Sequence, residues 1–260
     1  MNILDKIIEK KQTEIEIASK INPIEQLKET QRLFKIRDFK NSLISNDISI
    51  IAEIKFKSPS AGNLLKNILP GKISKSYEMN GASAISVLTD NHFFGGNLNF
   101  IHEVKSNCEI PVLRKDFIIT EYQIWESFTF GADAILLISD ALEFEKLKDL
   151  YQLSKELGLS VLLESHSKKS LDNTLKLNPE ILGINCRNLK TMETDLDWFK
   201  NCIPNINHEC IKIAESGIKN PNDLQLIKNL GYNGALIGTQ FMKSGKPGNA
   251  LAKILGRVPK

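Results

Sequence analysis

Short apolar segments recur along this chain, and their spacing restricts the possible folds more than any other feature of the sequence. The segments comprise residues 48–56, 84–88, 111–113, 134–138, 160–163, 181–184, 211–214 and 235–237. Amphipathic stretches separate them, and their starts lie roughly 20 to 35 residues apart, the length of one β-strand plus one α-helix. Near-continuous apolar strands are typical of a parallel sheet covered on both faces. About eight such units close a (β/α)8 barrel, whereas an open doubly wound sheet requires no particular number. We therefore predict an α/β fold consisting of a single (β/α)8 TIM barrel.

The residues before the first apolar segment follow the 3.6-residue period of a helix. Leu4 and Ile7 lie on one apolar face, and Asn22-Pro23 separates this helix from a second one. A chain of 260 residues fits one barrel of roughly 250 residues, and no linker or low-complexity segment divides it. We expect one domain over residues 1–260, of which about 1–45 form an N-terminal helical extension.

Composition excludes several classes of protein. Lys and Arg total 34 against 31 Asp and Glu, and this net charge of +3 gives no general footprint for nucleic acid or an anionic membrane. The 4 cysteines form no C-x-x-C pair and no H-E-x-x-H motif is present, which argues against a zinc site and suits a reducing compartment. No apolar run approaches the ~20 residues that span a bilayer, and the N-terminus does not resemble a signal peptide. We expect a cytoplasmic protein.

Polar side chains interrupt or end five of the predicted strands. Glu53 and Lys55 stand two apart in the first strand, so both point to the same side, which we expect to be the barrel interior near its carboxyl-terminal rim. The other groups at strand ends are Lys115, Glu164, Asn185, Arg187, Glu215 and Ser216. One charge at a strand end is ordinary, but burying five sets without a purpose compounds the desolvation penalty. Because the strand ends of a barrel converge on its catalytic face, this pattern predicts an active site.

Two glycine-containing turns suggest a phosphate site. Residues 215–218 follow the seventh strand and residues 237–240 follow the eighth, with a short helix expected from about Gln240. Small residues there expose backbone N–H groups, although each glycine can equally serve a tight turn. The loop at 57–63, rich in Ser, Pro and Gly, is either a lid or a solvated loop, and Lys57 or Ser58 could reach a phosphate from it.

Several blocks of sequence resemble the indole-3-glycerol-phosphate synthase family of tryptophan biosynthesis. The first is Glu53-Ile54-Lys55 followed by Ser58-Pro59-Ser60, and the set covers the chain from about residue 50 to residue 242 in the order found in the family. The remaining blocks are Ala84 to Asp90 with Phe93-Phe94-Gly95-Gly96, Leu113 to Phe117, Leu163-Glu164 with His166, Gly183 to Leu189, and Ala214 to Ile218.

This resemblance implies a barrel that uses no cofactor and no metal. The expected substrate is a small phosphorylated and carboxylated molecule, 1-(2-carboxyphenylamino)-1-deoxyribulose 5-phosphate, and the products are indole-3-glycerol phosphate, CO2 and water. By similarity, Lys115 is the acid in ring closure and Lys55 orients the carboxylate and serves as acid in dehydration, with Glu53 or Glu164 as base. Proton transfer suits a lysine whose pKa is shifted towards neutrality, as desolvation or a nearby cation can do.

The resemblance assigns the other polar and apolar site residues as well. Asn185, Glu215 and Ser216 would hold the sugar hydroxyls, and Arg187 would orient the polar end of the substrate. The residues expected around the aromatic ring are Phe94, Phe117, Leu137 and Leu189. The residues expected at the phosphate are Lys57, Ser58, Gly217, Gly238 and Thr239. His166 is expected to support the rim of the site rather than transfer protons.

Two alternative functions fit parts of the same pattern. A lysine at a strand end can be the nucleophile of a Schiff-base aldolase, and a barrel can also bind a phosphorylated ligand without turning it over. A binder has no need of both acids and bases, which disfavours the second alternative. Partners other than the substrate are not expected, and the chain is predicted to be a monomer or weak homo-oligomer.

Overall fold

The barrel predicted from the apolar repeat is present in the computed structural model, which describes residues 3–65, 68–188 and 191–260. Eight parallel strands close in the order β1-β10-β9-β8-β7-β6-β5-β4, with the first strand paired to the last. They are β1 (Ser49–Ile54), β4 (Ala84–Leu88), β5 (Val112–Lys115), β6 (Ala134–Ile138), β7 (Ser160–Ser165), β8 (Ile181–Asn185), β9 (Ile211–Glu215) and β10 (Gly234–Ile237). Closure rules out the open doubly wound sheet and confirms the predicted fold class.

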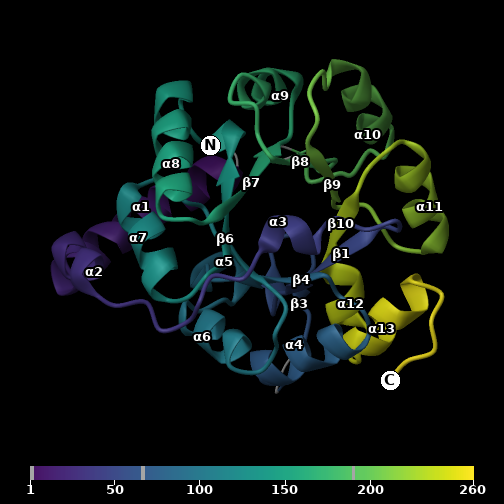
Figure 1. Ribbon diagram of the computed structural model, residues 1–260, viewed down its shortest axis with the longest axis horizontal. Coiled ribbons are helices and arrows are strands. Elements are labelled where there is room, and N and C mark those ends of the chain that lie inside the picture. Colours follow the sequence, from purple (N-terminus) through teal and green to yellow (C-terminus); the bar gives the residue numbers. More distant parts are fainter. Residues whose placement is uncertain (1–2, 66–67, 189–190) are drawn as a thin grey trace.

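Helices surround the strands, as Figure 1 shows in a view along the barrel. In chain order they are α4 (Pro70–Met79), α5 (Asn91–Phe94), α6 (Asn99–Lys105), α7 (Glu121–Thr129), α8 (Phe144–Glu156), α9 (Lys168–Leu175), α10 (Asp197–Cys202), α11 (Pro221–Asn229), α12 (Thr239–Lys243) and α13 (Pro247–Ile254). Short 3-10 turns occupy Ser139–Ala141 and Ile203–Asn205. The segment expected to be an irregular loop holds a small antiparallel hairpin, β2 (Lys57–Ser58) with β3 (Gly62–Asn63). In the described part of the chain, no helix combines the length and apolar composition that a membrane crossing requires.

The N-terminal extension contains helices α1 (Ile3–Ile21), α2 (Ile24–Glu29) and α3 (Phe39–Ser42). In Figure 1, α3 lies over the centre of the ring of strands. Phe39 and Leu43 are fully buried there and belong to the inner cluster with Ile51 and Ala84, and Ser49, the first residue of β1, donates a hydrogen bond of 3.1 Å to the Leu43 carbonyl. Because these contacts are with the beginnings of the strands, α3 closes the amino-terminal end of the barrel and leaves the opposite end for a site.

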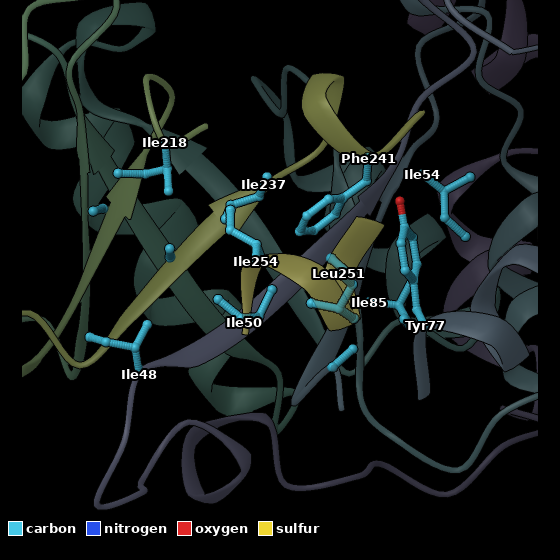
Figure 2. Close-up of a cluster of buried hydrophobic side chains, with 14 of the residues drawn as sticks. Ile48, Ile50, Ile54, Tyr77, Ile85, Ile218, Ile237, Phe241, Leu251 and Ile254 are labelled. Atoms are coloured by element: carbon cyan, nitrogen blue, oxygen red, sulfur yellow. The ribbon is translucent and has the colours of Figure 1, made fainter. Parts of the chain in front are cut away.

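Alternation along each strand separates an inner core from an outer one. On β1, Ile51 belongs to the inner cluster, whereas Ile50 and Ile54 belong to the outer cluster between strands and helices. Figure 2 shows part of this outer cluster, with Tyr77 of α4 beside Ile54. The Tyr77 hydroxyl donates a hydrogen bond of 3.1 Å to the backbone carbonyl of Glu53. The outer core thus fixes the end of β1 where a predicted site residue stands.

A buried ion pair ties the linker after α2 to the outside of the barrel. Asp133 and Lys105 are both inaccessible to solvent, and Lys105 Nζ lies 2.7 and 2.8 Å from the two Asp133 carboxylate oxygens. The backbone N–H groups of Arg37 and Val112 each donate to the same carboxylate at 2.8 Å. One carboxylate therefore joins the extension, α6 and the start of β5.

We predict that Asp133→Ala lowers the free energy of unfolding by about 3 to 5 kcal/mol, because it leaves the Lys105 ammonium buried without its counter-charge. Urea denaturation followed by circular dichroism measures this loss. Asp172→Ala is the control, since it removes an ion pair with Lys168 in which both side chains are about half exposed. A loss from Asp133→Ala no larger than that from the control would contradict the assigned role of this carboxylate.

Candidate active site

A layer of charged side chains covers the inner core at the carboxyl-terminal end of the barrel. Alternation places Glu53 two residues after the inner Ile51, Lys115 two after Leu113, and Glu164 two after Leu162. On the next strands, Asn185 and Glu215 end β8 and β9 and lie opposite each other in register. The expectation that these strand ends converge is therefore confirmed by their positions.

Lys115 is the centre of this layer. Its Nζ lies 2.6 Å from Glu215 Oε2, 3.4 Å from Glu164 Oε2 and 3.9 Å from Glu53 Oε2. Lys55 Nζ lies 2.5 Å from the other oxygen of Glu53. Two ammonium groups thus share three carboxylates, all of which are nearly inaccessible to solvent.

The electrostatic environment of Lys115 differs from the one that sequence suggested. Burial alone would lower the pKa of Lys115, but the charges of its three carboxylate neighbours outweigh burial and raise that pKa above its ordinary value of 10.5. The expected shift towards neutrality is wrong for this lysine, because its neighbours are anions rather than cations. Lys115 therefore stays protonated and can donate hydrogen bonds, which disfavours a Schiff-base role that needs a neutral amine.

Glu164 is held in its ionised form. Burial opposes ionisation, but Lys115 and His166 lower the pKa of Glu164 below its ordinary value. The His166 Nε2 contacts Glu164 Oε1 directly, and Asn185 Nδ2 donates to the same oxygen at 3.2 Å. The His166 Nδ1 lies 3.0 Å from the carbonyl oxygen of Arg187, and Glu164 raises the pKa of His166 against the effect of burial. His166 thus contacts both a carboxylate of the site and the backbone that follows β8.

Glu215 has the opposite character. Burial and the nearby charge of Glu164 raise its pKa to about 8. Among the described residues its Oε1 has no hydrogen-bond partner, and it points at Gly183, where an added Cβ would lie 2.4 Å away. At Gly238 an added Cβ would lie 2.1 Å from Glu53 Oε1. Both glycines provide the space that a buried carboxyl group occupies, a role that the sequence reading of Gly238 as a phosphate residue did not include.

A pocket of about 320 Å³ lies above the charged layer. One end is aromatic, with the rings of Phe94 and Phe117 5.9 Å apart and inclined by 31°. Ser216 and Gly217 lie at the pocket with φ of 68° and 74°, a left-handed turn that favours glycine and is unusual for serine. The other predicted residues that line the pocket are Glu53, Lys55, Ser58, Lys115, Glu164, Asn185, Arg187, Glu215, Gly238 and Thr239.

Two predicted residues, Leu137 and Lys57, do not line the pocket. The Leu137 side chain packs on the outside of the barrel with Leu147 and Leu150 of α8, so its assignment to the ring pocket is wrong by one residue. Lys57 is exposed and donates to the His92 carbonyl at 3.0 Å, away from the pocket lining. Leu189 lies outside the described residues.

Other pocket residues were not predicted. Leu136 and Ile138 face inward from β6, and Ile3, Leu4 and Ile7 of α1 line the pocket from the extension. Lys219 and Lys243, which also line it, stand three and four residues after Ser216 and Thr239. A lysine that closely follows a glycine turn expected to bind phosphate is the sequence signal that would identify both residues. Within the described chain, no three His, Cys, Asp or Glu side chains are grouped so that they could hold a metal ion.

Comparison with known proteins assigns the family. The family model for indole-3-glycerol phosphate synthase matches residues 4–254. The chain is 44% identical over 241 residues to the indole-3-glycerol phosphate synthase of Thermoanaerobacter sp. (strain X514), covering 93% of this chain and 92% of the relative. It is 40% identical over 257 residues to the enzyme of the same name from Burkholderia ambifaria, covering 97% and 98%.

The chain belongs to the indole-3-glycerol phosphate synthase family. As a member of this family it is a carboxy-lyase of tryptophan biosynthesis. Two solved structures share its fold. An N-acetylmannosamine-6-phosphate 2-epimerase from Clostridium perfringens superposes with a TM-score of 0.61 at 14% identity, over 84% of this chain and 97% of the epimerase. A thiamine phosphate pyrophosphorylase from Pyrococcus furiosus superposes with a TM-score of 0.58 at 11% identity, over 84% of this chain and 96% of the pyrophosphorylase.

The raised pKa of Glu215 predicts a specific dependence of stability on pH. The folded protein keeps a proton on Glu215 between pH 4.5, the ordinary pKa, and about pH 8, whereas the unfolded chain loses it. Folding therefore becomes less favourable as pH rises through this window, by at most about 1.4 kcal/mol per pH unit. Denaturant titrations at pH 5.5, 6.5, 7.5 and 8.5 should show a fall in the free energy of unfolding that Glu215→Gln reduces. The reduction is clearest between pH 5.5 and 6.5, because the raised pKa of His166 contributes a fall of its own above pH 6.5.

Glu53→Gln is the matched control for this measurement. Burial opposes its ionisation, but Lys55 and Lys115 lower the pKa of Glu53, so it is ionised across the same window in folded and unfolded chains. The control should keep the pH dependence of the unaltered protein. An unchanged slope in Glu215→Gln would show that another group causes it.

Proposed function

We propose that the charged layer of this chain converts 1-(2-carboxyphenylamino)-1-deoxyribulose 5-phosphate to indole-3-glycerol phosphate, CO2 and water by general acid–base catalysis. The observation that carries the proposal is the position of Lys115, a protonated lysine among three buried carboxyl groups at the base of a pocket. Ring closure places negative charge on a ketone oxygen, and a fixed ammonium group stabilises such charge in a site that excludes water.

The substrate is expected to lie across the pocket. Its aromatic ring fits the end formed by Phe94 and Phe117, where two rings already lie in contact. Its phosphate fits the backbone N–H groups of the turns at Ser216-Gly217 and Gly238-Thr239, with Ser58, Lys219 and Lys243 on the same lining. Arg187 and Asn185 also line the pocket and are proposed to orient the polar groups of the substrate.

Lys115 is proposed as the acid of ring closure. The ring carbon that carries the carboxylate attacks the ketone carbon, and the ketone oxygen takes a proton as the new carbon–carbon bond forms. An alkoxide is far more basic than an amine, so it accepts the proton even from a lysine whose pKa is raised. The bond to the carboxylate then breaks, CO2 leaves, and the electron pair of that bond restores the aromatic ring.

Lys55 and Glu53 are proposed as the acid and base of dehydration. Lys55 first orients the substrate carboxylate and then protonates the hydroxyl, which leaves as water, while Glu53 removes a proton from the neighbouring carbon so that the double bond of indole forms. Their 2.5 Å separation supports this pairing. Glu164 is the weaker candidate for the base because Lys115, His166 and Asn185 all contact it. Its proposed task is to hold Lys115, together with Glu215.

We also propose that one chain forms the complete site, as a monomer or weak homo-oligomer acting in the cytoplasm. The pocket supports a site formed by one chain, because strands, loops and α1 of the same chain line it together. In this proposal residues 1–260 form one domain and the extension completes its pocket. The proposed location in the cytoplasm is supported by the cysteines, all four of which are free thiols.

Turnover provides the direct test. Incubation of the protein with the carboxyphenylamino-deoxyribulose phosphate, without metal or nucleotide, should produce indole fluorescence and release one CO2 for each indole formed. Folded protein and authentic substrate that yield neither product would refute the proposed function.

Lys115→Ala should lower kcat by ~10²-fold or more, the scale on which general acid catalysis contributes. Single-turnover measurements of indole formation test this directly. Lys148→Ala, which removes an exposed lysine on α8, is the control and should leave kcat unchanged. If kcat for Lys115→Ala stayed within threefold of the unaltered enzyme, another group would have to supply the proton.

A further inference from the structure

A single lysine of the N-terminal extension reaches into the body of the protein. The buried residues of α1 are Leu4, Ile7 and Lys11, which the helical period places on one face. Leu4 and Ile7 line the pocket, whereas the Lys11 side chain, only 6% exposed, extends to two carboxylates beside it. A lysine on the apolar face of a helix needs a compensating partner, since an unpaired buried ammonium is unfavourable.

The two partners come from different loops at the top of the barrel. Lys11 Nζ lies 3.1 Å from Asp90 Oδ2, after β4, and 3.0 Å from Asp116 Oδ1, after β5. It also lies 2.8 Å from Glu14 on its own helix. Asp90 and Asp116 are 1% and 3% exposed, so the lysine neutralises charge that water does not reach.

Each of these aspartates holds the backbone of one pocket phenylalanine. Asp90 Oδ1 accepts hydrogen bonds from the N–H groups of Phe93 at 2.8 Å and Phe94 at 3.3 Å, and so caps α5. Asp116 Oδ1 accepts from the N–H of Phe117 at 2.8 Å. The ammonium of Lys11 therefore bridges the two segments whose aromatic rings form one end of the pocket.

We propose that Lys11 is a positioning residue that sets the separation of Phe94 and Phe117 and so shapes the end of the pocket that receives an aromatic ring. The inference rests on the proposed function, because it takes that ring to be the anthranilate part of the substrate. It assigns α1 a part in binding that goes beyond covering the barrel.

The surrounding charges explain why other groups do not replace Lys11. Asp116 keeps a second cation, Arg114, whose Nη2 lies 3.2 Å from Asp116 Oδ2, and Arg114 in turn pairs with Glu126. Asp90 has no other ion-pair partner within the described residues. Removing the ammonium therefore leaves Asp90 as an uncompensated buried charge near a second carboxylate, and repulsion moves the α5 segment and Phe94 away from Phe117.

The test compares the two ends of the pocket in Lys11→Met, which removes the ammonium group and keeps a flexible, unbranched side chain only one atom shorter. Anthranilate probes the aromatic end and inorganic phosphate probes the other, each measured by isothermal titration calorimetry without turnover. We expect anthranilate to bind at least ~10-fold more weakly, equivalent to about 1.4 kcal/mol, while phosphate affinity stays within about twofold. Lys11→Arg should restore most of the anthranilate affinity because it keeps the charge.

Lys10→Met is the matched control, since Lys10 is next to Lys11 in sequence but lies on the exposed face of α1. It should change neither affinity. Equal weakening of the binding of both ligands by Lys11→Met, or unchanged anthranilate binding, would overturn the positioning role.

If Lys11→Met does not fold, Asp90→Asn provides the test, because asparagine still caps α5 but no longer forms an ion pair with Lys11. Selective loss of anthranilate affinity in Asp90→Asn supports the positioning role, and normal anthranilate affinity overturns it.

Failure of this inference differs from failure of the proposed function. Normal anthranilate binding by Lys11→Met, together with indole formation by the unaltered protein, would remove the role of Lys11 and keep the function. Absence of anthranilate binding by the unaltered protein would count against the proposed function and with it against this inference.

Discussion

Three buried carboxylates cluster around one ammonium group at the end of a closed barrel, and the arrangement of the site depends on how their charges are balanced. Lys115 alone cannot neutralise Glu53, Glu164 and Glu215. Lys55 neutralises part of the excess, the His166 ring contacts Glu164, and Glu215 retains a proton near neutral pH. The barrel therefore holds acid and base groups in direct contact, which an apolar interior tolerates only when each charge has a partner.

Alternation along the strands made much of this layer predictable. Glu53 and Lys55 share a side of β1, and inward residues such as Leu162 and Leu113 precede Glu164 and Lys115 by two positions. The polar residue marks the inner face of each such strand, and the residues two positions before or after it point to the same face. The closed barrel itself followed from the number and spacing of the apolar segments.

Where no polar residue marked a face, the sequence could not settle the orientation. Residues 134–138 are all apolar, and both faces of that strand are buried, so nothing in the segment contradicts the pocket role of Leu137 that the resemblance implies, although Leu136 and Ile138 are the inner residues. The direction of the pKa shift of Lys115 does not follow from its own strand either, because it depends on neighbours from three other strands. The apolar face of α1 was visible, but its docking site was not, although Lys11 on that face was a sign of a buried anion.

The two glycines behind the carboxylates have a consequence for the variation that this fold can accept. The carboxyl group of Glu215 fills the space that a side chain at Gly183 would need, and Glu53 does the same for Gly238. In each case a methyl group added to the glycine would overlap a carboxyl oxygen. The acid can be replaced by a residue of the same size or smaller, but neither glycine can be enlarged by itself. A larger residue in place of the glycine becomes compatible only when the acid is shortened or turned, so these positions form two linked choices during divergence of the barrel. A redesign of the site for another substrate that enlarges either glycine would have to change the facing acid with it.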